Sequence, residues 1–136
     1  MTRRLESALI LWAALTGIGG VASAAAAAHL TSAPSLNAAS LILLAHAPAI
    51  IACLAAARAD LILPALGRVA SLLLSFGATL FSADIAMRVF IGMPLFPMAA
   101  PSGGVILIIG WGIIGLGAAL RLFARTSPRD NDKTLG

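Results

Sequence analysis

The sequence has few of the side chains that carry chemistry in soluble proteins. Its 136 residues include no Tyr, one Cys, two His and five acidic side chains. The single Cys53 excludes an intramolecular disulfide bond and a metal site built from several cysteines. The chain contains no motif for nucleotide binding, nucleophilic catalysis or paired carboxylates. We therefore expect no enzymatic activity, no metal site and no bound cofactor.

Apolar residues dominate what is present. Hydrophobic residues make up 60% of the chain and charged residues 10%, and the mean hydropathy is +1.03, which is typical of an integral membrane protein. No formal charge occurs between Glu6 and Arg58, a stretch long enough for two membrane crossings because each needs about 20 apolar residues. We predict an all-α fold, an integral membrane four-helix transmembrane bundle that forms a single membrane domain over residues 1–136.

Proline, turn-forming and charged residues divide the apolar sequence into four spans. The segment from Thr31 to Ser35 contains turn formers and a proline, and Pro94 and Pro97 interrupt the chain later. Pro48 lies inside the second apolar stretch, where we expect it to kink the helix without ending it. The predicted spans are residues 7–29, 36–57, 65–91 and 103–123, followed by a polar cytoplasmic tail over residues 124–136.

The positions of the cations predict the orientation in the membrane. In a four-span arrangement, eight of the nine Lys and Arg residues fall on the side of the two termini, and only Arg88 falls near the other side. Because positive loops are retained in the cytoplasm, we expect a multi-pass protein of a bacterial inner membrane with both termini cytoplasmic. The cations are scattered along membrane edges without a basic recognition helix, so we expect contact with the lipid bilayer and with no nucleic acid.

The first thirty residues have a second interpretation. Arg3 and Arg4, the apolar stretch that follows them, and the sequence Ala22-Ser-Ala24 are similar to a secretory signal with a cleavage site. The apolar stretch is longer than the core of a typical signal, which has about 7–15 residues. This length favours a first transmembrane span, and cleavage in the cell stays open as the alternative.

Small residues recur on one face of the first and last spans. Ala13, Gly17, Gly20 and Ala24 follow one another at intervals of four, three and four residues, which places them on a single stripe of a helix. Small residues let helix backbones approach closely in lipid. We expect this stripe to bring the first span into contact with the fourth, which has its own stripe at intervals of seven residues: Gly103, Gly110 and Gly117.

Several longer motifs occur along the chain. They are Gly19-Gly-Val-Ala-Ser-Ala-Ala-Ala-Ala-Ala-His29, Leu44-Ala-His-Ala-Pro48, Leu80-Phe-Ser-Ala-Asp84, and Phe96-Pro-Met-Ala-Ala-Pro-Ser-Gly-Gly104 with Gly110-Trp111. In these motifs the chain resembles the domain-of-unknown-function 423 family, which includes the transmembrane protein 256-like proteins of animals. The resemblance covers nearly the whole chain and implies a small multi-pass membrane protein. It implies no particular biochemical activity.

Four ionisable residues form the candidate polar site within the membrane. Asp84 and Arg88 are four residues apart and share a helix face, which favours an ion pair. His29 is expected at a similar depth, so a network of these three residues can cross the bundle. His46 lies about 15 Å deeper, and we expect a buried, hydrogen-bonded histidine, with metal or haem binding as the disfavoured alternative. Glu6 is expected to pair where the first and last spans converge, with one of Arg3, Arg121 or Arg125.

Two classes of function fit these features. The first is a structural or accessory role, in which a small bundle with glycine-lined faces packs against itself as a homo-oligomer or against subunits of a larger membrane complex. The second is a small oligomeric transporter or channel-like protein that uses the intramembrane cluster of His, Asp and Arg. We expect the first, because the polar residues are few. A wet cavity around His46 and Asp84 would favour the second.

Overall fold

The computed structural model describes residues 2–30 and 35–126, and their only regular secondary structure is α-helical. Each helix is long and apolar enough to cross a membrane. This confirms the prediction of an all-α bundle of four transmembrane helices. In chain order they are α1 (Thr2–His29), α2 (Leu36–Arg58), α3 (Pro64–Phe90) and α4 (Ala99–Thr126).

The second and third predicted spans coincide with α2 and α3 within one residue at each end, whereas α1 and α4 are longer than predicted. α4 begins at Ala99 and includes Pro101 in its first turn, where an N–H group would have no partner within the helix. It continues to Thr126, so the start of the expected polar tail is helical. The rest of that tail, 127–136, lies outside the described residues, and so do residues 31–34, which form most of the predicted turn between the first and second spans.

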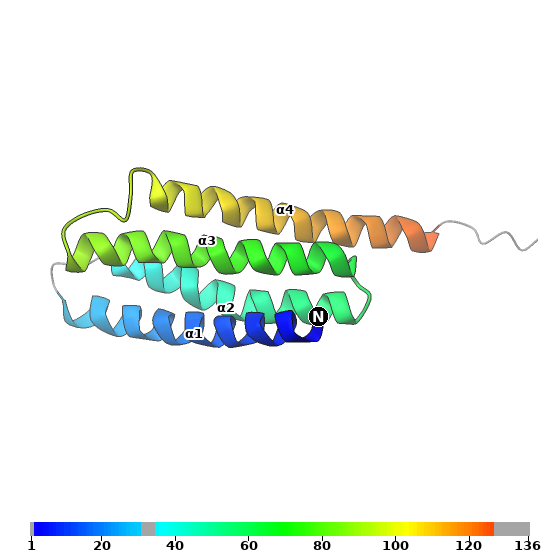
Figure 1. The fold of residues 1–136 in the computed structure, drawn as a ribbon, viewed down its shortest axis with the longest axis horizontal. Coiled ribbons are helices and arrows are strands. Elements are labelled where there is room, and N and C mark those ends of the chain that lie inside the picture. Colours follow the sequence, from blue (N-terminus) through cyan, green and yellow to red (C-terminus); the bar gives the residue numbers. More distant parts are fainter. Residues whose placement is uncertain (1, 31–34, 127–136) are drawn as a thin grey trace, which may run out of the picture.

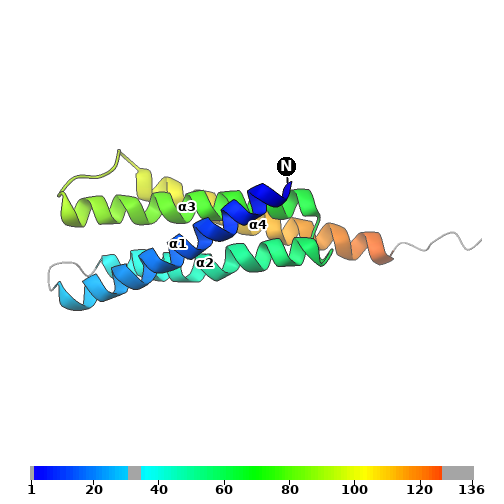
Figure 2. The same ribbon diagram turned by 60° about the horizontal axis from the view of Figure 1, so that its bottom comes forward.

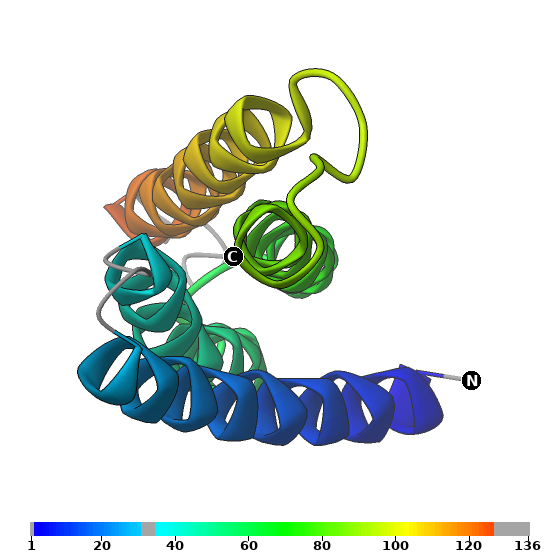
Figure 3. The same cartoon turned by 90° about the vertical axis from the view of Figure 1, so that its left-hand side faces the viewer.

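The four helices run alternately in opposite directions. The start of α1 and the end of α4 therefore lie at the same end of the bundle (Figure 1). The central helices α2 and α3 lie between the flanking helices α1 and α4, which occupy opposite sides (Figure 3). α1 crosses obliquely, so that its second half follows α2 and diverges from α3 (Figure 2). α2 continues through Pro48 without ending, as predicted.

The expected contact between the first and last helices is not formed. Extensive interfaces join α1 to α2, α2 to α3 and α3 to α4, and none of comparable extent joins α1 to α4 in the described residues. The prediction that two small-residue stripes bring these helices together is therefore wrong. A stripe of small residues determines how closely a neighbour can approach, but it does not select the neighbour.

The middle of the bundle is a cluster of apolar side chains from all four helices. Ile50 of α2 and Leu74 of α3 are fully buried within it. In lipid such contacts stabilise the fold through van der Waals packing, because the surrounding acyl chains are as apolar as the side chains themselves. The other members are Leu9, Ala13, Leu54, Ala78 and Leu107.

Candidate functional site

Asp84 lies near the end of α3, on the side of the bundle away from the termini, and its side chain is fully buried. Its Oδ2 accepts a hydrogen bond from Nε of Arg88 at 2.8 Å. Its Oδ1 accepts one from the backbone N–H of Leu95 at 2.8 Å. A carboxylate is costly inside a membrane protein unless it is paired and hydrogen-bonded. Asp84 has both kinds of partner and thereby ties α3 to the connection that precedes α4.

His46 joins a central helix to a flanking one. Its Nδ1 lies 2.7 Å from the carbonyl oxygen of Ile42, and its Nε2 lies 3.2 Å from the indole Nε1 of Trp111 in α4. A carbonyl oxygen only accepts a hydrogen bond and an indole N–H only donates one. The proton of His46 is therefore on Nδ1, and Nε2 accepts. The two rings also meet edge to face with centroids 6.2 Å apart, and only 7% of His46 is exposed.

The structure does not bring His29 into the predicted network. His29 is the last residue of α1 and is exposed. In the described residues Asp84 bonds Arg88 and Leu95 but not His29, because the end of α1 follows α2 and has moved away from α3 (Figure 2). The candidate polar residues thus form two separate groups, one at Asp84 and one at His46. No three His, Cys, Asp or Glu side chains come together as metal ligands within the described ranges.

The small residues of α1 face α2. A Cβ atom added at Gly20 would lie 2.7 Å from Cγ of Leu44, so this position leaves no room for a side chain. Gly17 is less tightly packed, since a Cβ there would lie at 3.6 Å from the nearest heavy atom. Ala13 is buried in the central cluster, and Ala24 is half-buried two turns beyond Gly17. These residues attach α1 to α2.

The glycine stripe of α4 faces α3. A Cβ atom at Gly103 would lie 2.6 Å from the backbone nitrogen of Phe81, which makes this a contact between two backbones. Gly110 and Gly117 are more loosely packed, with nearest distances of 2.9 Å and 3.4 Å to leucine side chains of α3. The closest approach of α4 to α3 is therefore near the start of α4.

Two ion pairs connect the helices at the end that holds the termini. Nε of Arg58, at the end of α2, donates to Oε2 of Glu6 at 2.7 Å. Arg121 of α4 pairs with Asp60, which follows α2 in a left-handed backbone conformation with φ of 58°. The prediction that Glu6 pairs with a cation of the first or last span is therefore wrong. Because α1 packs along α2, the nearest cation is the one that ends α2.

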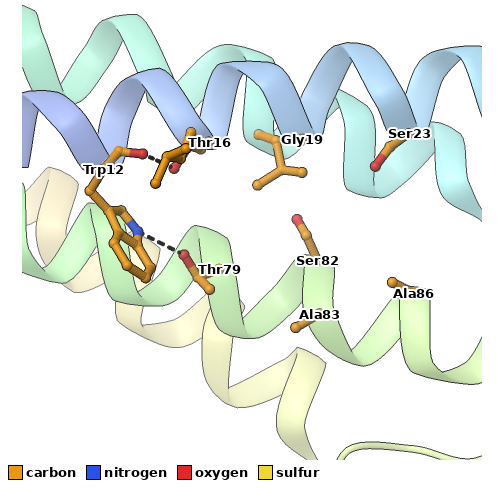
Figure 4. A pocket seen from close by; sticks show the side chains of 10 residues that line it. Trp12, Thr16, Gly19, Ser23, Thr79, Ser82, Ala83 and Ala86 are labelled. Carbon is orange, nitrogen blue, oxygen red and sulfur yellow. Dashed lines mark hydrogen bonds between the residues drawn. The ribbon is translucent and has the colours of Figure 1, made fainter.

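An open groove of about 270 Å³ lies between α1 and α3 (Figure 4). At one end the indole Nε1 of Trp12 donates to Oγ1 of Thr79 at 3.1 Å. Ser23 and Ser82 lie on opposite walls, and the hydroxyl of Ser82 donates to the carbonyl of Ala39 at 3.4 Å. The oblique course of α1 opens this groove toward the outside of the bundle. Neither His46 nor Asp84 lines it.

The partners of the two tryptophans were not predicted from the sequence. An indole N–H on an apolar helix needs a hydrogen-bond acceptor. The depth of each residue along its helix could have indicated which acceptor it meets. His46 lies ten residues after the start of α2 and Trp111 twelve residues after the start of α4, at the same end of the bundle. Matching depths on neighbouring helices would have indicated this pair. For Trp12 and Thr79 no comparable signal exists, because the contact depends on the crossing of α1 over α3.

Comparison with known proteins identifies one related family. A family model described as "Protein of unknown function (DUF423)" matches residues 23–104, which is more than half of the 136 residues. The matched segment begins in the second half of α1 and ends shortly after the start of α4, so it contains both His46 and Asp84. No curated protein and no solved structure matches the chain.

Proposed function

The chain belongs to the DUF423 family of proteins of unknown function, and from its own geometry we propose that it is a structural or accessory subunit whose helices pack against a larger membrane complex. Four helices able to span a membrane make it a multi-pass membrane protein. The proposal includes no catalytic step, no cofactor and no nucleic acid. It places the single membrane domain in a bacterial inner membrane with both termini cytoplasmic, because the predicted cation distribution favours that orientation.

The observation that carries the proposal is the outward face of α4. Only 17% of the most apolar stretch of this helix is buried, since it packs on α3 by one side. A Cβ atom added at Gly104, Gly112 or Gly115 would meet nothing within 4 Å. The three glycines fall within about 80° of one another around the helix. They expose a strip of backbone that a transmembrane helix of another subunit can approach closely.

The choice of glycine at these positions supports the same conclusion. Glycine in a helix interior is about 1 kcal/mol less favourable than alanine in soluble hosts. At position 103 the bundle itself requires glycine, because a side chain there would collide with α3. Gly104, Gly112 and Gly115 have no such neighbour among the described residues. A partner helix packed closely on this face would explain why glycine occurs at these three positions.

The interior supports packing over transport. His46 and Asp84 are buried and bonded to neighbouring protein groups, and the groove between α1 and α3 does not include them. An intramembrane ionisable group on a transport path has to meet water or solute. The alternative, a small oligomeric transporter or channel-like protein, would need a second conformation that opens one of these two groups.

Gentle detergent extraction of the tagged native protein, followed by a native gel and mass spectrometry, tests the proposal. We expect the protein in a stable larger complex, and we expect the double variant Gly112→Leu, Gly115→Leu to be released from it. Ala52→Leu, at an exposed alanine of α2, is the control and should stay bound. A wild-type protein that migrates alone or as a homo-oligomer would refute the accessory role and direct attention to flux assays on His46 and Asp84 variants.

The same experiment needs a check that the double variant still folds. Because nothing lies within 4 Å of either added Cβ and leucine favours a helix more than glycine does, its unfolding temperature in detergent should equal or slightly exceed that of the wild type. Release from the complex with unchanged unfolding isolates the loss of an external contact. A lowered unfolding temperature would show that this face is needed by the bundle itself and would remove the support for the proposal.

A further inference from the structure

Residues 91–98 connect α3 to α4 at the end of the bundle away from the termini (Figure 1). This segment, Ile91-Gly-Met-Pro-Leu-Phe-Pro-Met98, contains no polar or charged side chain. Its large side chains are exposed on the isolated chain, and so is Phe90 just before it. A contiguous apolar surface of this kind marks a contact site with another protein or with a membrane.

Asp84 holds this loop beside α3. The bond from the N–H of Leu95 to Oδ1 of Asp84 places the middle of the loop about a turn and a half below the last residue of α3. α4 also begins beside α3 and not beyond its end, because Gly103 lies against the backbone of Phe81. In Figure 1 the first turn of α4 lies beside α3 and short of its end. The loop therefore folds back along the end of α3 instead of extending away from it.

The depth of this region follows from the two arginines of α3. Arg68 and Arg88 are 20 residues apart, which corresponds to about 30 Å of helix and to the thickness of the hydrocarbon layer. With both cations placed at the boundaries of that layer, the long side chain of Arg88 can extend to the lipid phosphates just outside it. The apolar side chains of the loop then lie at the level where the acyl chains begin.

Arg88 keeps binding capacity at this boundary. Its Nε is bonded to Asp84, whereas the side chain as a whole is 51% exposed. Within the described residues this is the one hydrogen bond that the guanidinium makes, so its terminal amino groups are free to donate. A guanidinium can bind a carboxylate by one edge and a phosphate by another. The positive charge beside an apolar surface is complementary to a phospholipid.

We propose that Arg88 and the loop 91–98 form a binding surface for a phospholipid of the adjacent leaflet. Arg88 binds the lipid phosphate, and the side chains of Met93 and Phe96 lie among the acyl chains. Asp84 positions both parts, since one oxygen fixes the guanidinium and the other fixes the loop backbone. The two prolines reduce the number of N–H groups that the interface must satisfy. This surface is independent of the proposed helix contact on α4.

The first test locates the loop. A nitroxide label at Phe96→Cys, in a Cys53→Ala protein reconstituted in phosphatidylglycerol vesicles, is compared for collisions with oxygen and with a water-soluble nickel chelate. We expect collisions with oxygen to dominate at position 96 and collisions with nickel to dominate at a control label at Ala59→Cys, in the turn between α2 and α3. Asp84→Asn should shift position 96 toward nickel. A label at position 96 that is water-exposed in the otherwise unchanged protein would overturn the proposal.

The second test addresses the phosphate. Native mass spectrometry counts phosphatidylglycerol molecules retained by the full-length protein. We expect Arg88→Gln to bind this lipid about tenfold more weakly, and Arg88→Lys to retain part of the affinity because it keeps the charge. Unchanged retention by Arg88→Gln would overturn the role of Arg88. Arg88→Gln leaves the buried Asp84 without its ion-pair partner, which is expected to lower the stability of the variant. Its unfolding temperature is therefore measured as well, and lipid binding is compared at a temperature at which both proteins are folded.

Discussion

The central helices and the flanking helices are held in place by different means. In their most apolar stretches 44% and 50% of the residues of α2 and α3 are buried, against 22% and 17% in α1 and α4. Six of the seven buried polar side chains in the described residues belong to the central pair, and the exception is Thr16. Buried polar side chains are thus concentrated in the central helices. The flanking helices are attached mainly through glycine and alanine, with two tryptophan hydrogen bonds and two ion pairs in addition.

The difference follows from the solvent. A polar group that faces lipid has no water to bond, so it is stable only where protein supplies a partner. Ser71 and Ser75 show one solution, because each donates to the carbonyl four residues earlier in α3 at 2.8 Å. A flanking helix has fewer protein neighbours, so close backbone contact contributes a larger share of its attachment.

The largest expected effect breaks the attachment of α4. Gly103→Leu should destabilise the protein by about 3 kcal/mol, because the added side chain meets backbone atoms that cannot rotate away. Gly104→Leu, one residue later and with nothing within 4 Å, should not destabilise the protein, because leucine also favours a helix more than glycine does. Unfolding in mixed micelles followed by tryptophan fluorescence measures both. Equal losses would mean that α4 is not attached through the Gly103 contact.

The attachment of α1 should be more tolerant. Gly20→Ala should cost about 1–2 kcal/mol, since the nearest atoms belong mainly to the flexible side chain of Leu44. Gly17→Ala should be neutral or slightly stabilising, because its Cβ fits at 3.6 Å and alanine favours the helix. The same unfolding assay applies. A larger loss at Gly17 than at Gly20 would place the close contact of α1 elsewhere.

One hydrogen bond between a central and a flanking helix joins His46 and Trp111. A double-mutant cycle with His46→Leu and Trp111→Phe should give a coupling free energy of about 1 kcal/mol, because interhelical hydrogen bonds in membrane proteins are individually modest. The coupling is measured from the unfolding of the wild type and the three variants, followed by far-ultraviolet circular dichroism because replacing Trp111 removes a fluorescent group. Additive effects would show that the hydrogen bond between α2 and α4 contributes nothing to stability.

The smallest expected effect concerns the contact of α1 with α3. A cycle with Trp12→Phe and Thr79→Val should give a coupling of about 0.5 kcal/mol, because this pair lies at the rim of an open groove. Measured by circular dichroism in the same micelles, this coupling sharpens the contrast with the pair of His46 and Trp111, in which the histidine is buried. A coupling larger than that of His46 and Trp111 would reverse the expected ranking of the exposed and the part-buried hydrogen bond.

The four helices could be predicted because one physical quantity, the thickness of the hydrocarbon layer, determines the length of each apolar segment. The predicted ends of the second and third spans agree with α2 and α3 because charged residues, Gly92 and prolines mark them. The predicted fourth span began at residue 103, after the last of the nearby prolines, whereas α4 begins at Ala99, because the first turn of a helix accepts a proline.

Which residues meet across the bundle could not be predicted as well. The pair of Asp84 and Arg88 is local, and helical spacing alone indicates it. The partners of Glu6 and His29 depend on the neighbour and crossing angle of α1, and a stripe of small residues fits several neighbours equally well. The bond from Leu95 to Asp84 depends on the path of an irregular loop, for which the sequence has no periodic signal.

The neighbour order of the helices has a consequence for biosynthesis. Each extensive interface joins a helix to the one that precedes it in the chain, so every newly inserted segment finds its partner already in the bilayer. Sequence-local contacts of this kind favour rapid assembly. The chain can therefore complete its interfaces one at a time as it leaves the ribosome, without waiting for the last helix to close a ring.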